Sequence, residues 1–174
     1  MKFIVYFHGY GSSPKSDKVD RIKSILPDSE VYAFPIDINH DVASPELEDA
    51  ITFAMMNNFY TESETIFIGT SLGAWWAAKM ADKFGVRSVL INPCYDPVSS
   101  LEKYGVSEEM RSKYSKMDIT DLSNKSFVFS EVDEVIDHSV LISKLDEREC
   151  SFDIFQNTSH RFNGAEFDFV IRGI

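Results

Sequence analysis

Apolar residues gather in six short runs along the chain, each five to seven residues long and separated by more polar segments. The runs cover residues 2–7, 30–36, 65–69, 88–92, 126–130 and 151–155. Most are apolar at nearly every position, whereas a strand with one exposed face alternates apolar and polar residues. Continuous apolar runs are typical of strands buried on both faces of a parallel sheet. The pattern therefore predicts six strands with helices over both faces.

The segments between these runs repeat apolar residues at the three- or four-residue spacing of a helix. The first helix is expected over residues 13–26, with Ser13 as its N-cap, Pro14 at its first helical position and Pro27 as its stop. Further helices are predicted over residues 44–56 and 72–84, around Leu141 and Leu145, and from Phe167 to Ile174. This alternation predicts an α/β fold with a doubly wound, mostly parallel six-stranded sheet, whose functional residues follow the carboxyl ends of strands.

Residues 94–125 interrupt the alternation. The stretch is longer than an ordinary connection and is rich in Ser, Lys, Asp and Glu. Two interpretations stay open for it, a small lid and a solvated crossover segment. Since no linker, repeat or low-complexity tract divides the sequence, residues 1–174 are predicted to form a single domain.

Residues 69–73 read Gly-Thr-Ser-Leu-Gly and match the pattern G-x-S-x-G between an apolar strand and a helix. A serine in so tight a turn has strained backbone angles, and its neighbours Gly69 and Gly73 must lack a Cβ to avoid collision. The turn exposes the hydroxyl in front of the amides that begin the helix. We therefore predict that Ser71 is a nucleophile, the alternative being a Gly-Ser turn without chemical meaning.

The first predicted strand ends in His8-Gly9-Tyr10-Gly11. Hydrolases with a nucleophilic serine of this kind stabilise the oxyanion with the amide after the nucleophile and with one from such a first loop. The candidate donors are therefore the N–H groups of Leu72 and Tyr10. His8 is interpreted as an anchor of the loop rather than as a catalytic group.

A nucleophilic serine also needs a general base and an acid that orients it, here expected in the chain order Ser, acid, His. His160 follows the last predicted strand and is the predicted base. Asp133 lies three residues past the end of the fifth strand and is the predicted acid. Four further carboxylates stay open as alternatives: Asp96, Glu131, Glu134 and Asp137, the last of which also suits the cap of the following helix. His40 and His138 are interpreted as surface or capping histidines.

Charge and cysteine content narrow the class of partner. The chain has 28 acidic and 17 basic residues and a net charge of -11, which would repel a nucleic acid backbone. The first run is too short for a signal peptide and no run approaches the roughly 20 residues that span a bilayer, so we expect a cytoplasmic protein without a membrane partner. Cys94 and Cys150 are interpreted as small buried hydrophobic residues, with a disulfide between them as the alternative.

Several segments together resemble one known family. They are HGYGSSP at residues 8–14, GTSLGAWWA at 69–77, NPCYDP at 92–97, VDEVID at 132–137 and SHRF at 159–162. Together they are similar to the YqiA-like small esterases of the α/β-hydrolase superfamily, over nearly the whole chain. The resemblance implies a minimal α/β-hydrolase lacking the superfamily's first two strands, a triad of Ser71, Asp133 and His160, and no metal or organic cofactor.

The predicted function is that of a serine hydrolase acting on carboxylic esters with small, soluble acyl groups. Long acyl chains need an extended apolar trough, and the chain has no large apolar insertion to build one. A thioesterase uses the same steps and stays open. A catalytically silent α/β-hydrolase-fold binding module stays open as well. A flavodoxin-like nucleotide binder is the remaining alternative, and the lack of a phosphate-binding glycine motif in the sequence argues against it. Trp75 and Trp76, beside the nucleophile, are expected in the core.

Overall fold

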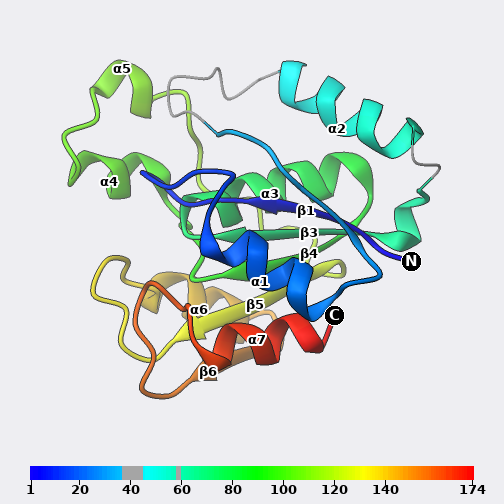
Figure 1. Cartoon of the computed structure of the whole chain (residues 1–174). Coiled ribbons are helices and arrows are strands. Elements are labelled where there is room, and N and C mark those ends of the chain that lie inside the picture. The colour runs from blue at the N-terminus through cyan, green and yellow to red at the C-terminus, as the bar shows by residue number, and fades with distance from the viewer. Residues whose placement is uncertain (37–44, 58–59) are drawn as a thin grey trace.

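A six-stranded sheet lies between two layers of helices in the computed structural model, which describes residues 1–36, 45–57 and 60–174 (Figure 1). The strands are β1 (Phe3–Phe7), β2 (Glu30–Ala33), β3 (Thr65–Thr70), β4 (Arg87–Ile91), β5 (Lys125–Ser130) and β6 (Phe152–Phe155). Their order is β2-β1-β3-β4-β5-β6, and every neighbouring pair is parallel. The predicted doubly wound α/β sheet is therefore confirmed, and all of its strand pairs are parallel.

Helices cover both faces of the sheet, as the apolar runs require. The helices that do so are α1 (Asp17–Ile25), α2 (Pro45–Asn57), α3 (Leu72–Phe84), α6 (Ser139–Asp146) and α7 (Ala165–Arg172). The shorter helices α4 (Pro97–Glu102), α5 (Glu108–Arg111) and the 3₁₀ helix η1 (Glu62–Glu64) belong to the connections. Ile4 and Tyr6 of β1 pack on the face covered by α1 and α7. Phe3, Val5 and Phe7 pack on the opposite face, with α2, α3 and α6. Because successive side chains of a strand point to opposite faces, β1 is buried on both.

The first helix begins later than predicted. α1 starts at Asp17 with Ser16 at the N-cap position, whereas Ser13 accepts a hydrogen bond from the Lys15 amide at 3.3 Å in the preceding turn. The apolar stripe of the helix begins only at Val19, so residues 13–16 have no side chain that a helix would bury against the sheet. Ser44, predicted to begin the second helix, lies outside the described residues, as does His40.

The segment from residue 94 to 125 is anchored to the core. Tyr114, Met117 and Ile119 are buried, and the Trp75 indole N–H donates to the Ser115 carbonyl at 2.9 Å. Figure 1 shows α4 and α5 beyond one end of the sheet. Both tryptophans beside Ser71 are buried in the core, as predicted. Whether the segment acts as a lid or only as a crossover stays a prediction, as does the single-domain organisation.

The two cysteines are free, so the alternative of a disulfide is wrong. Cys94 is buried as predicted, but Cys150 is only half-buried because it lies in the loop between α6 and β6. Among the residues that the structure describes, no helix is both long and apolar enough to cross a bilayer.

α3 approaches the end of β1 at backbone distance, and this close packing depends on Gly73. A Cβ on Gly73 would overlap the carbonyl oxygen of Phe7. A Cβ on Gly69, at the end of β3, would overlap the carbonyl oxygen of Gly73 itself. Since backbone atoms cannot move aside as a flexible side chain can, only glycine allows this helix to start so near the strands.

Candidate active site

Ser71 lies in a strained turn between β3 and α3, as the glycine pattern predicts. Its φ of 56° and ψ of -123° are a conformation that costs a residue with a Cβ free energy. Two backbone hydrogen bonds hold the turn. The Ser71 amide donates to the Ile91 carbonyl at 3.0 Å, and the Cys94 amide donates to the Ser71 carbonyl at 3.1 Å. The turn is therefore bound to the end of β4, and the Ser71 hydroxyl lies beyond the carboxyl ends of the strands.

The topology places Ser71 at the point where the strand order changes direction. β1 lies between β2 and β3, so the chain leaves β1 toward one edge of the sheet, to β2, and leaves β3 toward the other edge, to β4. The crevice outside the carboxyl ends of such strands is where α/β proteins bind ligands. The loop after β1 and the turn after β3 therefore face one another across this crevice.

The loop after β1 approaches the serine at Gly9. A Cβ on Gly9 would lie 3.3 Å from the Ser71 Cβ and 3.2 Å from the Thr70 oxygen, which leaves little space for a larger residue. His8 is buried and bridges the loop: its Nε2 accepts from the Ile36 amide at 3.1 Å, and its Nδ1 contacts the Gly9 oxygen at 3.0 Å. Burial lowers the pKa of the His8 imidazole, which favours the neutral ring that can accept at Nε2.

Two backbone amides beside Ser71 are available to a ligand. Leu72 is the first residue of α3, where an N–H group has no acceptor within the helix. Tyr10 follows Gly9 in the loop opposite. Within the described residues, neither the Leu72 nor the Tyr10 amide has an acceptor. Both could therefore donate to negative charge that develops on an atom bound to Ser71.

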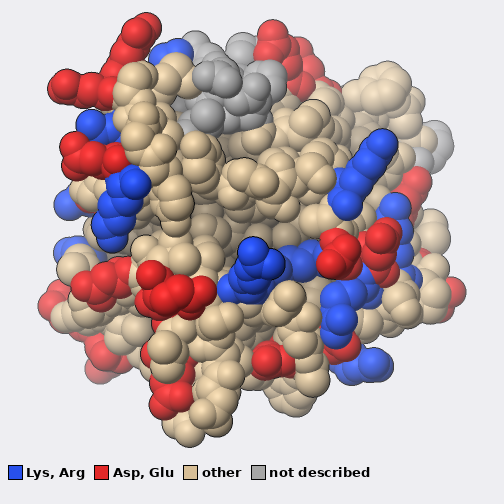
Figure 2. Space-filling model, turned by 60° about the vertical axis from the view of Figure 1, so that its left-hand side comes forward, with Lys and Arg blue, Asp and Glu red and all other residues tan. Residues whose placement is uncertain are grey.

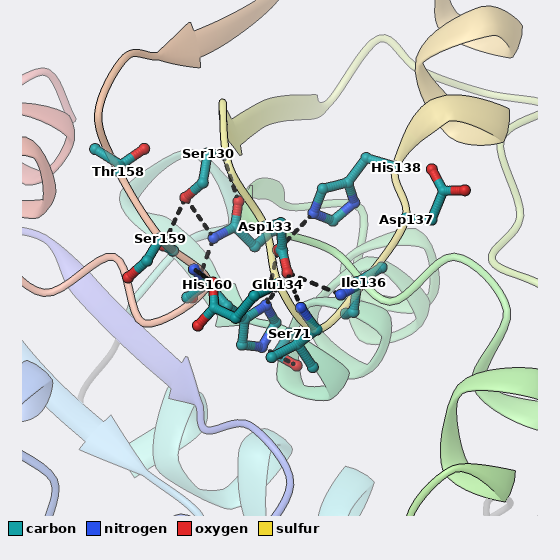
Figure 3. A network of polar contacts seen from close by, with 12 residues as sticks. Ser71, Ser130, Asp133, Glu134, Ile136, Asp137, His138, Thr158, Ser159 and His160 are labelled. Carbon is teal, nitrogen blue, oxygen red and sulfur yellow. Dashed lines mark hydrogen bonds and ion pairs between the residues drawn. The ribbon is translucent and has the colours of Figure 1, made fainter.

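His160 connects Ser71 with Asp133 (Figure 3). Its Nε2 lies 3.0 Å from the Ser71 Oγ, and its Nδ1 lies 2.7 Å and 2.9 Å from the two Asp133 carboxylate oxygens. An ionised carboxylate only accepts, so Nδ1 donates, and in the neutral ring Nε2 is left to accept from the serine hydroxyl. The structure thus brings the three predicted residues, from three different strand ends, into one line of hydrogen bonds.

Asp133 is buried and is surrounded by donors. Its side chain is only 3% exposed, and it accepts from His138, His160 and the amides of Val135 and Ile136. Burial by itself would raise the pKa of Asp133, but the hydrogen bonds from His138, His160 and the Ile136 amide outweigh it. They hold the pKa of this carboxyl well below its usual range. Asp133 therefore remains an anion that can orient the His160 ring.

The other carboxylates considered for the acid contact different partners. Asp96 caps α4 by accepting from the Ser99 amide at 3.3 Å and the Ser99 hydroxyl at 3.1 Å. Asp137 accepts from the Ser139 amide at 2.9 Å, at the start of α6. Glu131 accepts from the Asn157 amide at 3.0 Å. Only Glu134 contacts His160, and it accepts from the backbone amide at 3.0 Å rather than from the ring.

The interpretation of His138 as a surface or capping histidine is wrong. The residue occupies the N-cap position of α6 but makes no side-chain cap bond, and it is buried against Phe129 with ring centroids 5.0 Å apart. Its Nε2 lies 2.8 Å from the Asp133 carboxylate, opposite His160 (Figure 3). The sequence carries no signal for this contact, because it depends on how the loop folds back after Asp133.

Asn92 and Ser130 support the loop that carries His160, and the sequence interpretation missed both. The Asn92 amide nitrogen donates to the Ser130 Oγ at 2.8 Å and to the His160 carbonyl at 3.1 Å. The Ser130 hydroxyl donates to the Ser159 carbonyl at 2.7 Å. Both residues stand at strand ends, so the rule that functional residues follow strands could have identified them.

Comparison with known proteins identifies the family of this chain and solved structures with a similar fold. The family model described as "Uncharacterised protein family (UPF0227)" matches residues 3–169. A UPF0227 protein of Shewanella sp. (strain ANA-3) is 27% identical over 142 residues, which is 77% of each chain. The solved structure of an esterase from Pyrobaculum calidifontis has a TM-score of 0.67 at 19% identity, covering 99% of this chain and 74% of that one. Mouse alpha/beta hydrolase domain-containing protein 10 has a TM-score of 0.64 at 12% identity, over 97% of this chain and 86% of that one. The fold is therefore that of the α/β hydrolases, and the chain belongs to the uncharacterised protein family UPF0227.

Proposed function

We propose that this protein is a serine esterase that cleaves carboxylic esters with small acyl groups. One observation carries the proposal: the Ser71 Oγ lies 3.0 Å from His160 Nε2, and His160 Nδ1 lies 2.7 Å from the buried Asp133 carboxylate. These distances suit a nucleophile, a general base and an orienting acid. The likeness of the fold to that of a named esterase adds support, although fold alone does not fix function.

In the first half of the proposed reaction the Ser71 Oγ attacks the ester carbonyl carbon while His160 Nε2 takes the hydroxyl proton. The carbonyl oxygen becomes an oxyanion that the Tyr10 and Leu72 amides stabilise. As this intermediate collapses, the carbon–oxygen bond to the alcohol breaks and His160 gives its proton to the departing alkoxide. The products are the free alcohol and an acyl group on Ser71.

Water completes the reaction in the second half. It attacks the acyl carbon while its proton passes to His160 Nε2, and the same two amides hold the second oxyanion. The bond from the carbon to Ser71 Oγ then breaks, and His160 returns the proton to the serine. Asp133 stays ionised throughout, because its donors favour the anion, and it stabilises the imidazolium formed in each half.

A narrow apolar slot beside Ser71 suits a small acyl group. Its volume is about 140 Å³, and its walls include Leu101, Tyr104, Val135 and Ile136. Cys94 also lines it, and burial raises the pKa of this thiol to about 11, so the thiol stays protonated and does not compete as a nucleophile. A long acyl chain would have to leave most of its methylenes outside so small a space.

A thioester would react by the same steps, so a thioesterase stays within the proposal as its nearest alternative. A silent binding module is less well supported. It has no need for a strained serine in line with a histidine and a buried carboxylate, and the strain would cost it free energy without any gain in chemistry.

We predict that a fluorophosphonate probe labels Ser71, because this reagent reacts with activated serines. Intact-mass and peptide mass spectrometry should show one adduct, located on Ser71. Ser71→Ala should abolish labelling, whereas Ser13→Ala, which changes an exposed serine outside the hydrogen-bonded line, should leave it unchanged. Labelling that persists in Ser71→Ala would exclude the proposed nucleophile.

Replacing the orienting acid should strongly reduce turnover. Asp133→Asn is expected to lower kcat for a 4-nitrophenyl ester about 10⁴-fold, the loss typical when the acid of such a triad is replaced. Asp96→Asn removes a carboxylate that caps α4 and should change kcat less than about threefold. The opposite ranking of the two variants would identify Asp96 as the acid.

Asp133 should also make stability depend on pH. Its folded pKa lies below the unfolded value of about 3.9, so its contribution is complete above about pH 5 and is lost as the pH falls. Urea unfolding should therefore show a gap in unfolding free energy between the wild type and Asp133→Asn that shrinks from pH 5 toward pH 2. For Ser71→Ala, which removes no carboxylate, the gap should stay constant. A constant gap for Asp133→Asn would contradict the assigned ionisation.

The slot predicts a preference for short acyl chains. Across 4-nitrophenyl esters of increasing acyl length, kcat/KM should reach its maximum at a short chain and fall well before palmitate. Leu101→Ala removes part of the buried wall and should move the maximum to longer chains. A steady rise of kcat/KM out to palmitate in the wild type would overturn the small-acyl assignment.

A further inference from the structure

Two cavities of different character meet at Ser71 and His160. One is the apolar slot of about 140 Å³. The other is larger, about 450 Å³, and opens on the far side of the same two residues, between α1, the loop after β1 and the loop after β6. An ester held at Ser71 with its acyl group in the slot would extend its alcohol half into this larger cavity. The lining of the larger cavity therefore bears on the choice of alcohol.

Three cationic side chains line the larger cavity. Lys18 and Arg21 come from α1, and Arg161 follows His160 directly in the chain. Figure 2 shows basic side chains gathered beside a hollow in the middle of one face, with acidic side chains to the left of them and, on the right, acidic side chains mixed with further basic ones. The protein as a whole has a net charge of -11, so its average composition does not explain a cationic wall here.

Lys18 and Arg21 are held in place by neighbours. The Lys18 Nζ donates to the Arg161 carbonyl at 2.6 Å and lies 5.6 Å from the centroid of the Phe167 ring. Arg21 binds the Asp168 carboxylate through Nε at 2.8 Å and Nη2 at 2.7 Å. These contacts hold both side chains at the cavity wall, which lowers the entropy cost of ordering them when a ligand binds.

The positive charges are only partly balanced. Asp17 is the one carboxylate among the described residues that line this cavity, and Asp168, which lies outside the lining, balances Arg21 alone. Within the described part of the chain, neither Lys18 nor Arg161 forms an ion pair, and the Arg161 side chain is exposed. Burial lowers the pKa of Lys18, and the charges of Arg161 and Arg21 lower it further, against the opposing effect of Asp17. The cations thus repel one another, and a bound anion would relieve this repulsion.

Hydroxyl donors complete the same wall. The Tyr6 hydroxyl and the Thr70 Oγ1, both in the cavity lining, form a hydrogen bond of 2.9 Å with each other. Burial raises the pKa of Tyr6 to about 12, so both hydroxyls keep their protons; one proton forms the bond between them, and the other remains for a ligand. Cations beside neutral donors are the groups that bind carboxylate or phosphate oxygens.

We propose that the alcohol half of the substrate carries an anionic group, a carboxylate or a phosphate, which Lys18, Arg21 and Arg161 bind in the larger cavity. This inference rests on the proposed function, since it assumes an ester at Ser71. The anionic group itself does not react. The ester bond breaks as described above, His160 protonates the departing alcohol oxygen, and the alcohol leaves with its anionic group unchanged.

Two matched substrate pairs test the proposal. The first compares 3-carboxyphenyl butyrate with 3-carbamoylphenyl butyrate, which differ in charge but hardly in shape. The second compares butyryl glycerol 3-phosphate with butyryl glycerol. At low salt, kcat/KM for the charged member should exceed that for the neutral member about tenfold in at least one pair, the size expected of one charge-assisted hydrogen bond. A preference in the first pair, the second or both identifies the carboxylate, the phosphate or either as the bound group.

The preference should depend on the cationic wall. Arg161→Gln should lower the ratio of charged to neutral kcat/KM several-fold, and circular dichroism would verify that the variant is folded. Lys23→Gln removes an exposed charge from the same helix as Lys18 but outside the cavity, and should leave the ratio unchanged. In the wild type, 500 mM KCl should reduce the ratio, because salt screens charges at a partly exposed site. This arm needs no variant.

The proposal is overturned if the ratio is one or less in both pairs, or if a preference survives both Arg161→Gln and high salt. The proposed function has separate evidence. Fluorophosphonate labelling of Ser71 and turnover of the neutral esters would uphold a serine esterase even where no charged ester is preferred. Failure of both would remove the esterase itself.

Discussion

The close approach of backbone to backbone where α3 meets the end of β1 is the constraint on which the site depends. The packing leaves no room for a side chain at Gly73, against the carbonyl of Phe7, or at Gly69, between β3 and the helix. This packing permits the strained conformation of Ser71 and brings Gly9 beside its side chain. Because the contacts join backbone to backbone, they place the serine at the crevice between the ends of β1 and β3 without relying on flexible groups.

The second half of the site depends on one buried carboxylate. Desolvation opposes the charge of Asp133, so the anion is stable there only because several donors converge on it from a single loop and from His160. His138 supplies one of these donors and packs on Phe129. Asn92 and Ser130 then tie the loop of His160 to the ends of β4 and β5. The orientation of the His160 imidazole is therefore set by residues at the end of β4 and by residues at and after the end of β5.

Net charge and local charge lead to different conclusions in this protein. An overall charge of -11 argues against polyanionic partners at long range, where the summed field acts. At contact distance the nearest groups dominate, since salt weakens the effect of more distant charges over about 10 Å at 0.1 M ionic strength. Lys18, Arg21 and Arg161 can therefore make one cavity wall positive within an acidic molecule. The net charge thus bears on large polyanions approaching from a distance, and the cavity wall on a small anionic group in contact with it.

Local pattern by itself determined the strands, most of the helices, the parallel sheet and the positions of Ser71, Asp133 and His160 after three strand ends. These features depend on periodicity, on glycine where the backbone is strained and on the chain order of short motifs. All three can be recognised from residues that are close together in the sequence. Only the tertiary structure decided where α1 begins, that His138 is buried against Asp133, and that cations from α1 and from the loop after β6 share a cavity. Each of these features depends on which distant segments the fold brings together and which side chains those segments bury. Such contacts cannot be predicted from spacing along the chain.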